Sequence, residues 1–133
     1  MPGRGASVHG MLLLDTSFLI EFEDELLRSQ VGPATAVLAA RRSVPVAISI
    51  VALGELAEGY TDATAFNGFV SRFRVVQLSR AIAWRMALLQ VTLPQRLGEN
   101  DAWIAATALA YGATLVAREK AFNHVPQLDY LAF

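Results

Sequence analysis

The sequence predicts an α/β fold, a three-layer α/β/α sandwich with a mainly parallel central sheet. Short apolar runs alternate along the chain with longer segments of helical periodicity, and turn or capping residues separate the two kinds of segment. The 133 residues are within the usual size of one domain, and 54% of them are hydrophobic whereas 17% are charged. Because this composition provides enough apolar surface for a core, we expect an ordered globular protein.

Short apolar runs define the expected strands. The first run ends directly before Asp15, the second is dense in β-branched residues, and the fourth follows Gly112. A last strand is expected at an edge of the sheet. The predicted strands are 11–14, 44–50, 75–78, 113–117 and 129–131.

Capping residues define the expected helices between these strands. Serine, threonine, aspartate or asparagine precedes apolar residues at helical spacing, and glycine or proline follows them. The acidic side chains of the first helix, including Glu25, are expected to be solvated. The predicted helices, with their capping residues in parentheses, are 18 to about 31 (Thr16 or Ser17), 33–42, 51–60 (Ser49), 63–73 (Asp62), 80–93 (Ser79) and 101–111 (Asn100).

Charge and composition exclude several classes of protein. The net charge of −1 argues against the broad basic surface of a dedicated nucleic-acid-binding domain, so any contact with nucleic acid is expected to be local. The absence of cysteine excludes disulfides, thiolate zinc sites and cysteine nucleophiles, and is compatible with the cytoplasm. No apolar run approaches the roughly 20 residues of a membrane-spanning helix. Residues 1–10 lack the apolar stretch of a secretory signal and are interpreted as a flexible leader before one domain, 11–133.

Four acidic residues are expected at one edge of the sheet. Asp15 ends the first predicted strand, Glu119 follows the fourth, and Asp101 lies in the first turn of the helix before that fourth strand. Glu55 lies on the helix that leaves the second strand. Because ligands of open α/β sheets gather beyond the carboxyl ends of the strands, the four carboxylates could converge there. Taken singly, each acid has an ordinary explanation as a helix cap, a partner of a helix dipole or a solvated side chain.

Converging carboxylates indicate a metal site. Anionic carboxylates repel one another, so a buried cluster requires a cation or raised pKa values. Carboxylate oxygens select hard ions such as Mg²⁺ or Mn²⁺, which bridge to substrate phosphate and activate an attacking water. The pattern therefore predicts metal-dependent hydrolysis of a phosphodiester. A phosphatase- or receiver-like domain with Asp15 as a phosphorylated nucleophile is disfavoured, because position 17 is serine rather than a second acid.

Polar neighbours of the acids are assigned supporting roles. Thr16 or Ser17 could hold Asp15 through its hydroxyl group. Asn100 could similarly orient Asp101. Each of these three polar residues also suits a helix cap, so both roles stay open.

Other polar and aromatic residues have less specific interpretations. Arg118 could clamp a phosphate or form a surface ion pair. His9 and His124 are expected to be peripheral. Trp84 and the apolar residues near it are expected in the core or at a dimer contact, and Trp103 is expected to pack beneath the site or to stack a base.

Four ordered motifs resemble those of PIN-domain proteins. The run Leu-Leu-Leu-Asp-Thr-Ser at 12–17 resembles the family's opening, in which an aspartate ends the first strand and a small polar residue follows. Segment 48–59, with Leu-Gly-Glu-Leu, resembles the second acidic motif, and segment 100–108, Asn-Asp-Ala-Trp-Ile-Ala-Ala-Thr-Ala, resembles the third and most specific one. Segment 112–119 is similar to the strand that presents the last acid. The resemblance covers about 11–133, and the size matches the VapC-type toxins of toxin–antitoxin pairs.

The resemblance implies a PIN-like fold and Mg²⁺- or Mn²⁺-dependent cleavage of RNA. It also implies inhibition by a cognate antitoxin protein and formation of a homodimer. The acids that it assigns to the metal centre are Asp15, Glu55, Asp101 and Glu119. Two departures leave an alternative, since the family's fourth acid is more often aspartate and a small polar residue usually stands where this chain has Ala117. The alternative is a PIN-like module that binds RNA or an antitoxin with weak or no catalysis.

Overall fold

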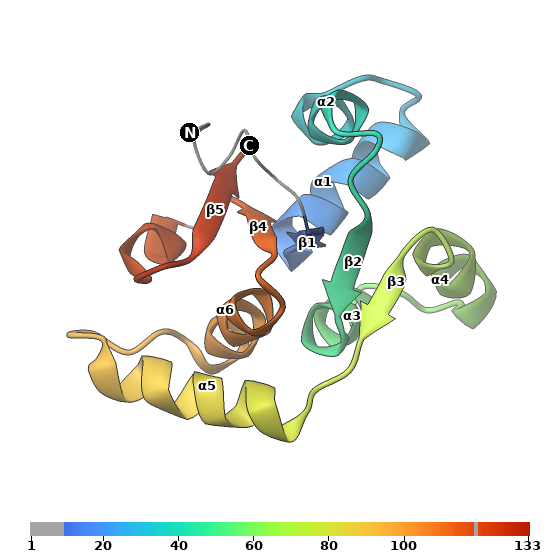
Figure 1. Ribbon diagram of the computed structural model, residues 1–133. Coiled ribbons are helices and arrows are strands. Elements are labelled where there is room, and N and C mark those ends of the chain that lie inside the picture. The colour runs from blue at the N-terminus through green and yellow to red at the C-terminus, as the bar shows by residue number, and fades with distance from the viewer. Residues whose placement is uncertain (1–9, 119) are drawn as a thin grey trace.

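A five-stranded sheet forms the centre of the molecule (Figure 1). The computed structural model describes residues 10–118 and 120–133, so residues 1–9 of the predicted leader and Glu119 lie outside the described residues. The strands are β1 (Leu12–Leu14), β2 (Val46–Ser49), β3 (Arg74–Val76), β4 (Thr114–Ala117) and β5 (Asp129–Ala132). They lie in the order β3-β2-β1-β4-β5, and all pairings between neighbouring strands are parallel. The predicted α/β fold with a parallel sheet is confirmed.

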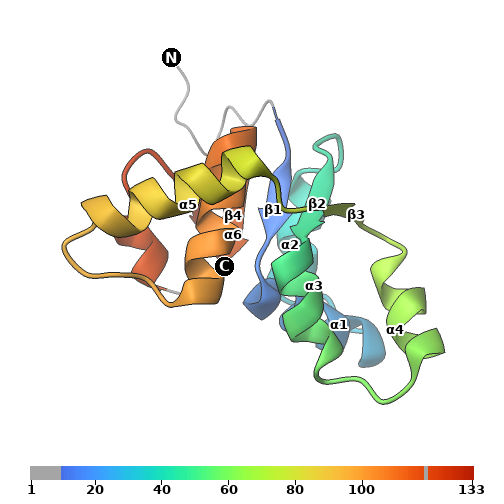
Figure 2. The same ribbon diagram turned by 90° about the horizontal axis from the view of Figure 1, so that it is seen from below.

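Helices flank this sheet. They are α1 (Thr16–Leu27), α2 (Pro33–Ala40), α3 (Ile50–Ala57), α4 (Ala63–Val70), α5 (Arg80–Thr92), α6 (Glu99–Tyr111) and the 3₁₀ helix η1 (Lys120–His124). Figure 1 shows α2 above the strands and α5 and α6 below them. In the view from below, α5 lies across α6 (Figure 2), and the two helices pack against each other.

Most helix boundaries follow the expected capping residues. Ser49, Asp62 and Ser79 cap α3, α4 and α5, and each side chain accepts a hydrogen bond from a backbone N–H in the first turn. Gly112 ends α6 in the left-handed conformation, with φ of 60°, as its sequence position predicts. The helix predicted for 63–73 ends earlier, at Val70, because the following residues form a turn before β3.

Two predicted caps are wrong. Asp15, rather than Thr16 or Ser17, caps α1, because the extended backbone after β1 brings the Asp15 carboxylate to the backbone N–H of Ser17. Helix α6 begins after Gly98, which provides no side-chain hydrogen bond. Asn100 therefore lies inside α6, where its side chain can reach another helix.

The central strands carry the core. The three residues of β1 are completely buried, as expected of a parallel strand that is covered on both faces. The prediction that Trp84 lies in the core is wrong, since its side chain on α5 is 68% exposed, whereas Leu89 of the same helix is buried.

In the part of the chain that the structure describes, no helix has the length and apolar character needed to span a membrane.

The expectation that Glu25 is solvated is also wrong. Glu25 is 4% exposed, and its carboxylate accepts hydrogen bonds from the backbone N–H groups of Gly32 (3.1 Å), Ala34 (3.0 Å) and Thr35 (2.7 Å). These groups lie at the start of α2, where the capping residue Gly32 has no side chain to offer. Glu25 of α1 therefore supplies the missing cap of α2.

Candidate active site

Asp15 lies at the carboxyl end of β1, in the middle of the sheet, and is 3% exposed. Its Oδ2 accepts hydrogen bonds from the Ser17 hydroxyl at 2.7 Å and from the Ser17 backbone N–H at 3.3 Å. The Ser17 hydroxyl oxygen accepts a bond in turn from the backbone N–H of Arg118, just beyond β4, at 3.2 Å. Through this chain of bonds, Asp15 is held against two neighbouring strand ends.

Burial raises the pKa of Asp15 above its ordinary value of 3.8. Hydrogen bonds from Ser17 and from the Thr16 backbone offset part of this effect, and the nearby negative charge of Glu55 adds to the increase. Within residues 10–118 and 120–133, no basic side chain forms an ion pair with Asp15 or Glu55. A carboxylate in these surroundings is stabilised by a proton or by a bound cation.

Glu55 joins three helices. It comes from α3, and its Oε1 accepts a 2.6 Å hydrogen bond from the Thr16 hydroxyl of α1. Its Oε2 accepts a 3.1 Å bond from the Asn100 side-chain amide of α6. Of the two candidates to hold Asp15, Ser17 is confirmed, whereas Thr16 bonds Glu55 instead. Asn100, which was expected to orient Asp101 or to cap its helix, also bonds Glu55.

Asp101 lies in the first turn of α6 and is partly buried. Together with Glu55 it lines a hollow of about 380 Å³, whose other lining residues are Gly98, Glu99 and Asn100. Glu99 was not expected to contribute, and the only signal for it in the sequence is its position two residues before Asp101. Glu99 and Asp101 lie in the first turn of α6, where the helix dipole favours negative charge.

The structure thus brings Asp15 near Glu55, and Glu55 and Asp101 around one hollow. Glu119 lies outside the described residues. Among residues 10–118 and 120–133, no three histidine, cysteine, aspartate or glutamate side chains are grouped closely enough to hold a metal ion. The convergence of four acids therefore stays a prediction, although the oxygen donors that surround the hollow are of the kind that Mg²⁺ and Mn²⁺ prefer.

Arg118 has the ion pair that was one of its two expected roles. Its Nη2 lies 3.3 Å from Oε1 of Glu21, and its guanidinium carbon lies 4.5 Å from the centre of the Phe133 ring. The guanidinium group is thus engaged with α1 and with the residue after β5. Arg118 is linked to Asp15 through its backbone N–H, which donates to the Ser17 hydroxyl that in turn bonds Asp15.

Comparison with known sequences bears on the class of this protein. The family model of the PIN domain matches residues 12–128. Ribonuclease VapC4 from Mycobacterium tuberculosis is 26% identical over an alignment of length 96; the match covers 63% of this chain and 74% of that protein.

Solved structures have the same fold. A chain in the crystal structure of VapBC2 from Rickettsia felis, bound to a DNA fragment from their promoter, superposes with a TM-score of 0.77 at 23% identity, covering 92% of this chain and 98% of that chain. A chain of a toxin–antitoxin complex from Klebsiella pneumoniae gives a TM-score of 0.70 at 28% identity, covering 90% and 95%.

The parallel sheet, the acids at its carboxyl edge and the match over most of the chain define the class: the chain belongs to the PIN domain family. More particularly, it is similar to a VapC ribonuclease, to a chain of a VapBC complex and to a chain of a toxin–antitoxin complex.

Proposed function

We propose that this protein is a metal-dependent endoribonuclease and the toxin of a type II toxin–antitoxin pair. Membership of the PIN domain family and similarity to a VapC ribonuclease support a nuclease that hydrolyses phosphodiester bonds. The observation that carries the proposal is the pair of neighbouring carboxylates, Asp15 and Glu55, each held by a hydroxyl donor. Glu55 and Asp101 line the same hollow. Such fixed oxygen donors suit a hard divalent ion.

The residues that would hold Mg²⁺ or Mn²⁺ are Asp15, Glu55, Asp101 and Glu119. When bound, the ion would lower the pKa of the attacking water and offset negative charge on the phosphate. The chain's own contribution is orientation, because the bonds from Ser17, Thr16 and Asn100 hold two of the carboxylates before substrate arrives.

Removal of the metal tests this proposal directly. In Mn²⁺, the full chain is expected to cleave single-stranded RNA internally, and EDTA is expected to abolish the cleavage. Asp101→Asn should lower the rate by at least about 100-fold, since partners outside the ligand set alone are typically worth 10–100-fold. Asp62→Asn, which changes an exposed helix cap, is the matched control.

Two outcomes would contradict the proposal. Cleavage that persists in EDTA or in a pure Asp101→Asn preparation would show that the acids do not carry the reaction. RNA binding without cleavage in the wild-type chain would instead support the alternative, a PIN-like binding module, which the unusual residues Ala117 and Glu119 favour.

Removal of the Thr16 hydroxyl is a second, finer prediction. Thr16→Val keeps the volume of the side chain but removes the donor to Glu55, so the carboxylate is no longer fixed. We expect kcat to fall by about 10-fold or more, and the Mn²⁺ concentration for half-maximal activity to rise, with little change in RNA affinity. Thr64→Val, at an exposed position on α4, serves as the control. Equal kcat and equal Mn²⁺ dependence in the two variants would rule out this positioning role.

Partners follow from the same proposal. As the toxin of such a pair, the protein would cleave cellular RNA in the cytoplasm, form a homodimer and be inhibited by a cognate antitoxin protein. Support comes from the toxin–antitoxin complexes whose chains share its fold. The exposed apolar side chains of Trp84, Leu88 and Val91 on α5 offer surface for self-association. The molar mass in solution, compared with 14.4 kDa for one chain, tests the dimer.

A further inference from the structure

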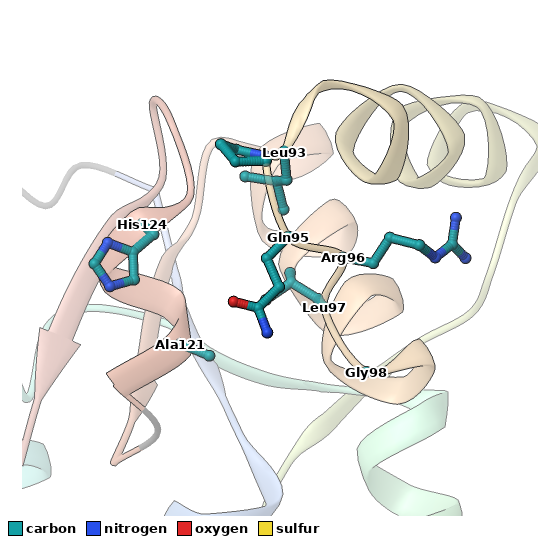
Figure 3. A pocket seen from close by; sticks show the side chains of 8 residues that line it. Leu93, Gln95, Arg96, Leu97, Gly98, Ala121 and His124 are labelled. Carbon is teal, nitrogen blue, oxygen red and sulfur yellow. The ribbon is translucent and has the colours of Figure 1, made fainter.

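Figure 3 shows a second hollow, of about 620 Å³. One wall is the loop between α5 and α6, and the other is η1. Gly98 lines both hollows, so the second begins where the acidic one ends. Its volume falls within the range of about 300–1,000 Å³ that is typical of sites for small organic groups. We call it the side hollow.

The loop that forms one wall is fixed by a buried glutamine. Gln90 of α5 is 5% exposed, and its Nε2 donates to the Leu97 carbonyl oxygen at 2.9 Å. The backbone N–H of Leu97 donates back to Oε1 of Gln90, also at 2.9 Å. Because both ends of one buried amide bind the same loop residue, the wall is formed before any ligand arrives, and little ordering entropy is lost on binding.

The lining combines apolar surface with hydrogen-bonding groups. Leu93, Pro94 and Leu97 provide apolar contacts, whereas Gln95 and His124 provide donors and acceptors. Figure 3 shows the Gln95 side chain between the loop and η1, while the Arg96 side chain extends away from His124. This combination matches an unstacked nucleobase, which has an apolar face and an edge of donors and acceptors.

The positive charge of Arg96 also favours an RNA strand in the side hollow. The acidic hollow contains Glu55, Glu99 and Asp101, so RNA phosphates that approach it without a metal ion are repelled. Arg96 is the basic residue among those that line the side hollow, and arginine suits a phosphate oxygen pair. An RNA strand that crosses both hollows would therefore meet a cation next to the acids.

We infer that the side hollow binds the nucleotide next to the scissile phosphate of a single-stranded RNA, an inference that rests on the proposed function. Gln95 and His124 contact its base, and Arg96 contacts an adjoining phosphate. The side hollow thereby contributes to the choice of cleavage position.

Photocrosslinking tests this inference without relying on cleavage. The full-length Asp101→Asn variant is mixed with a randomised single-stranded RNA that carries 4-thiouridine, and the mixture is irradiated. The positions of the crosslinks are then mapped by mass spectrometry of the crosslinked peptides. We expect crosslinks in 93–98 and 120–124, reduced at least about fivefold by Gln95→Ala. Gln30→Ala, at an exposed position beyond the far end of α1 from Asp15, is the matched control and should leave them unchanged.

Salt dependence of RNA affinity tests the phosphate contact. Arg96→Gln should lower the slope of log affinity against log salt by about one, as for the loss of one phosphate contact. An unchanged slope would remove Arg96 from the inference.

Parallel cleavage assays of the same RNA pool by the wild-type chain separate the two proposals. Crosslinks at the side hollow without cleavage by the wild type would overturn the proposed function and leave an RNA-binding site. Three other outcomes would contradict nucleotide binding by the side hollow but keep the proposed nuclease. In each the wild type cleaves RNA, and crosslinks are absent, lie elsewhere or are unaffected by Gln95→Ala.

Discussion

Asp15→Asn is expected to abolish RNA cleavage and, at neutral pH without divalent metal, to make the fold more stable. The carboxylate is buried, it lies near Glu55, and its pKa is raised by burial, so its negative charge opposes folding. Asparagine removes the charge and still caps a helix well. Loss of the charge should therefore raise the midpoint of thermal unfolding in EDTA, while the rate of RNA cleavage falls by at least about 100-fold.

The pH dependence has a defined sign. Because the pKa of Asp15 in the folded state is higher than 3.8, the folded state binds its proton more tightly than the unfolded state. Stability from this group is complete below pH 3.8 and is lost as the pH rises through the folded-state pKa. The advantage of Asp15→Asn should accordingly be largest at neutral pH and should disappear as the pH approaches 3.8.

Divalent metal should reverse the order of the thermal unfolding midpoints, so that the wild type becomes more stable than Asp15→Asn. If Mn²⁺ binds the proposed site, it would stabilise the wild type by mass action and would have fewer ligands in Asp15→Asn. Asp62→Asn is the matched control, because Asp62 caps α4 with an exposed side chain and should give the same unfolding midpoint as the wild type. A midpoint for Asp15→Asn that is no higher than that of the wild type in EDTA at pH 7 would contradict the prediction.

Local signals in the sequence were sufficient for the fold and for the position of Asp15 at the carboxyl end of β1. The apolar run that forms β1 and the β-branched run that forms β2 are both short and buried, and their alternation with helices leaves few arrangements other than a parallel sheet. Asp15 follows a strand, so the rule that ligands gather beyond carboxyl ends was enough to assign it to the edge of the sheet.

The partners of these acids could not be predicted in the same way. Thr16 lies next to Asp15 in the sequence but bonds Glu55, because consecutive side chains on a helix point in different directions. Asn100 reaches Glu55 across 45 positions, a contact that depends on how α3 and α6 pack. Capping residues that are equally suitable, such as Asp15 and Ser17, also leave the first residue of a helix undecided by one or two positions.

The partners of Glu25 could not be predicted from the sequence either, and they matter more for stability. In the sequence it stands among other acids on a helix, which is typical of a solvated face, and only the tertiary structure reveals that α2 begins against it. We expect Glu25→Ala to lower the free energy of unfolding by about 3 kcal/mol, because it leaves buried backbone donors at Gly32, Ala34 and Thr35 without their charged acceptor. Urea unfolding at pH 7 measures the loss.

Two matched variants isolate the cause. Asp24→Asn changes the neighbouring acid, which is exposed and pairs with Arg28 on the surface, so it should cost no more than about 1 kcal/mol. Gly32→Ala leaves Glu25 in place but introduces a Cβ that would overlap its carboxylate, so this small substitution should also destabilise the fold. Equal stability of Glu25→Ala and Asp24→Asn would show that the three bonds contribute nothing.

Acid should remove the contribution of Glu25. Burial alone would raise its pKa, but the hydrogen bonds from Thr35, Ala34 and Gly32 outweigh burial and hold the pKa below the ordinary value of 4.5. The stabilisation is therefore complete above pH 4.5 and is lost as the pH falls through the folded-state pKa. The difference in the free energy of unfolding between the wild type and Glu25→Gln should narrow over that acidic range, whereas a difference that is independent of pH would mean that the charge of Glu25 is not what holds α2.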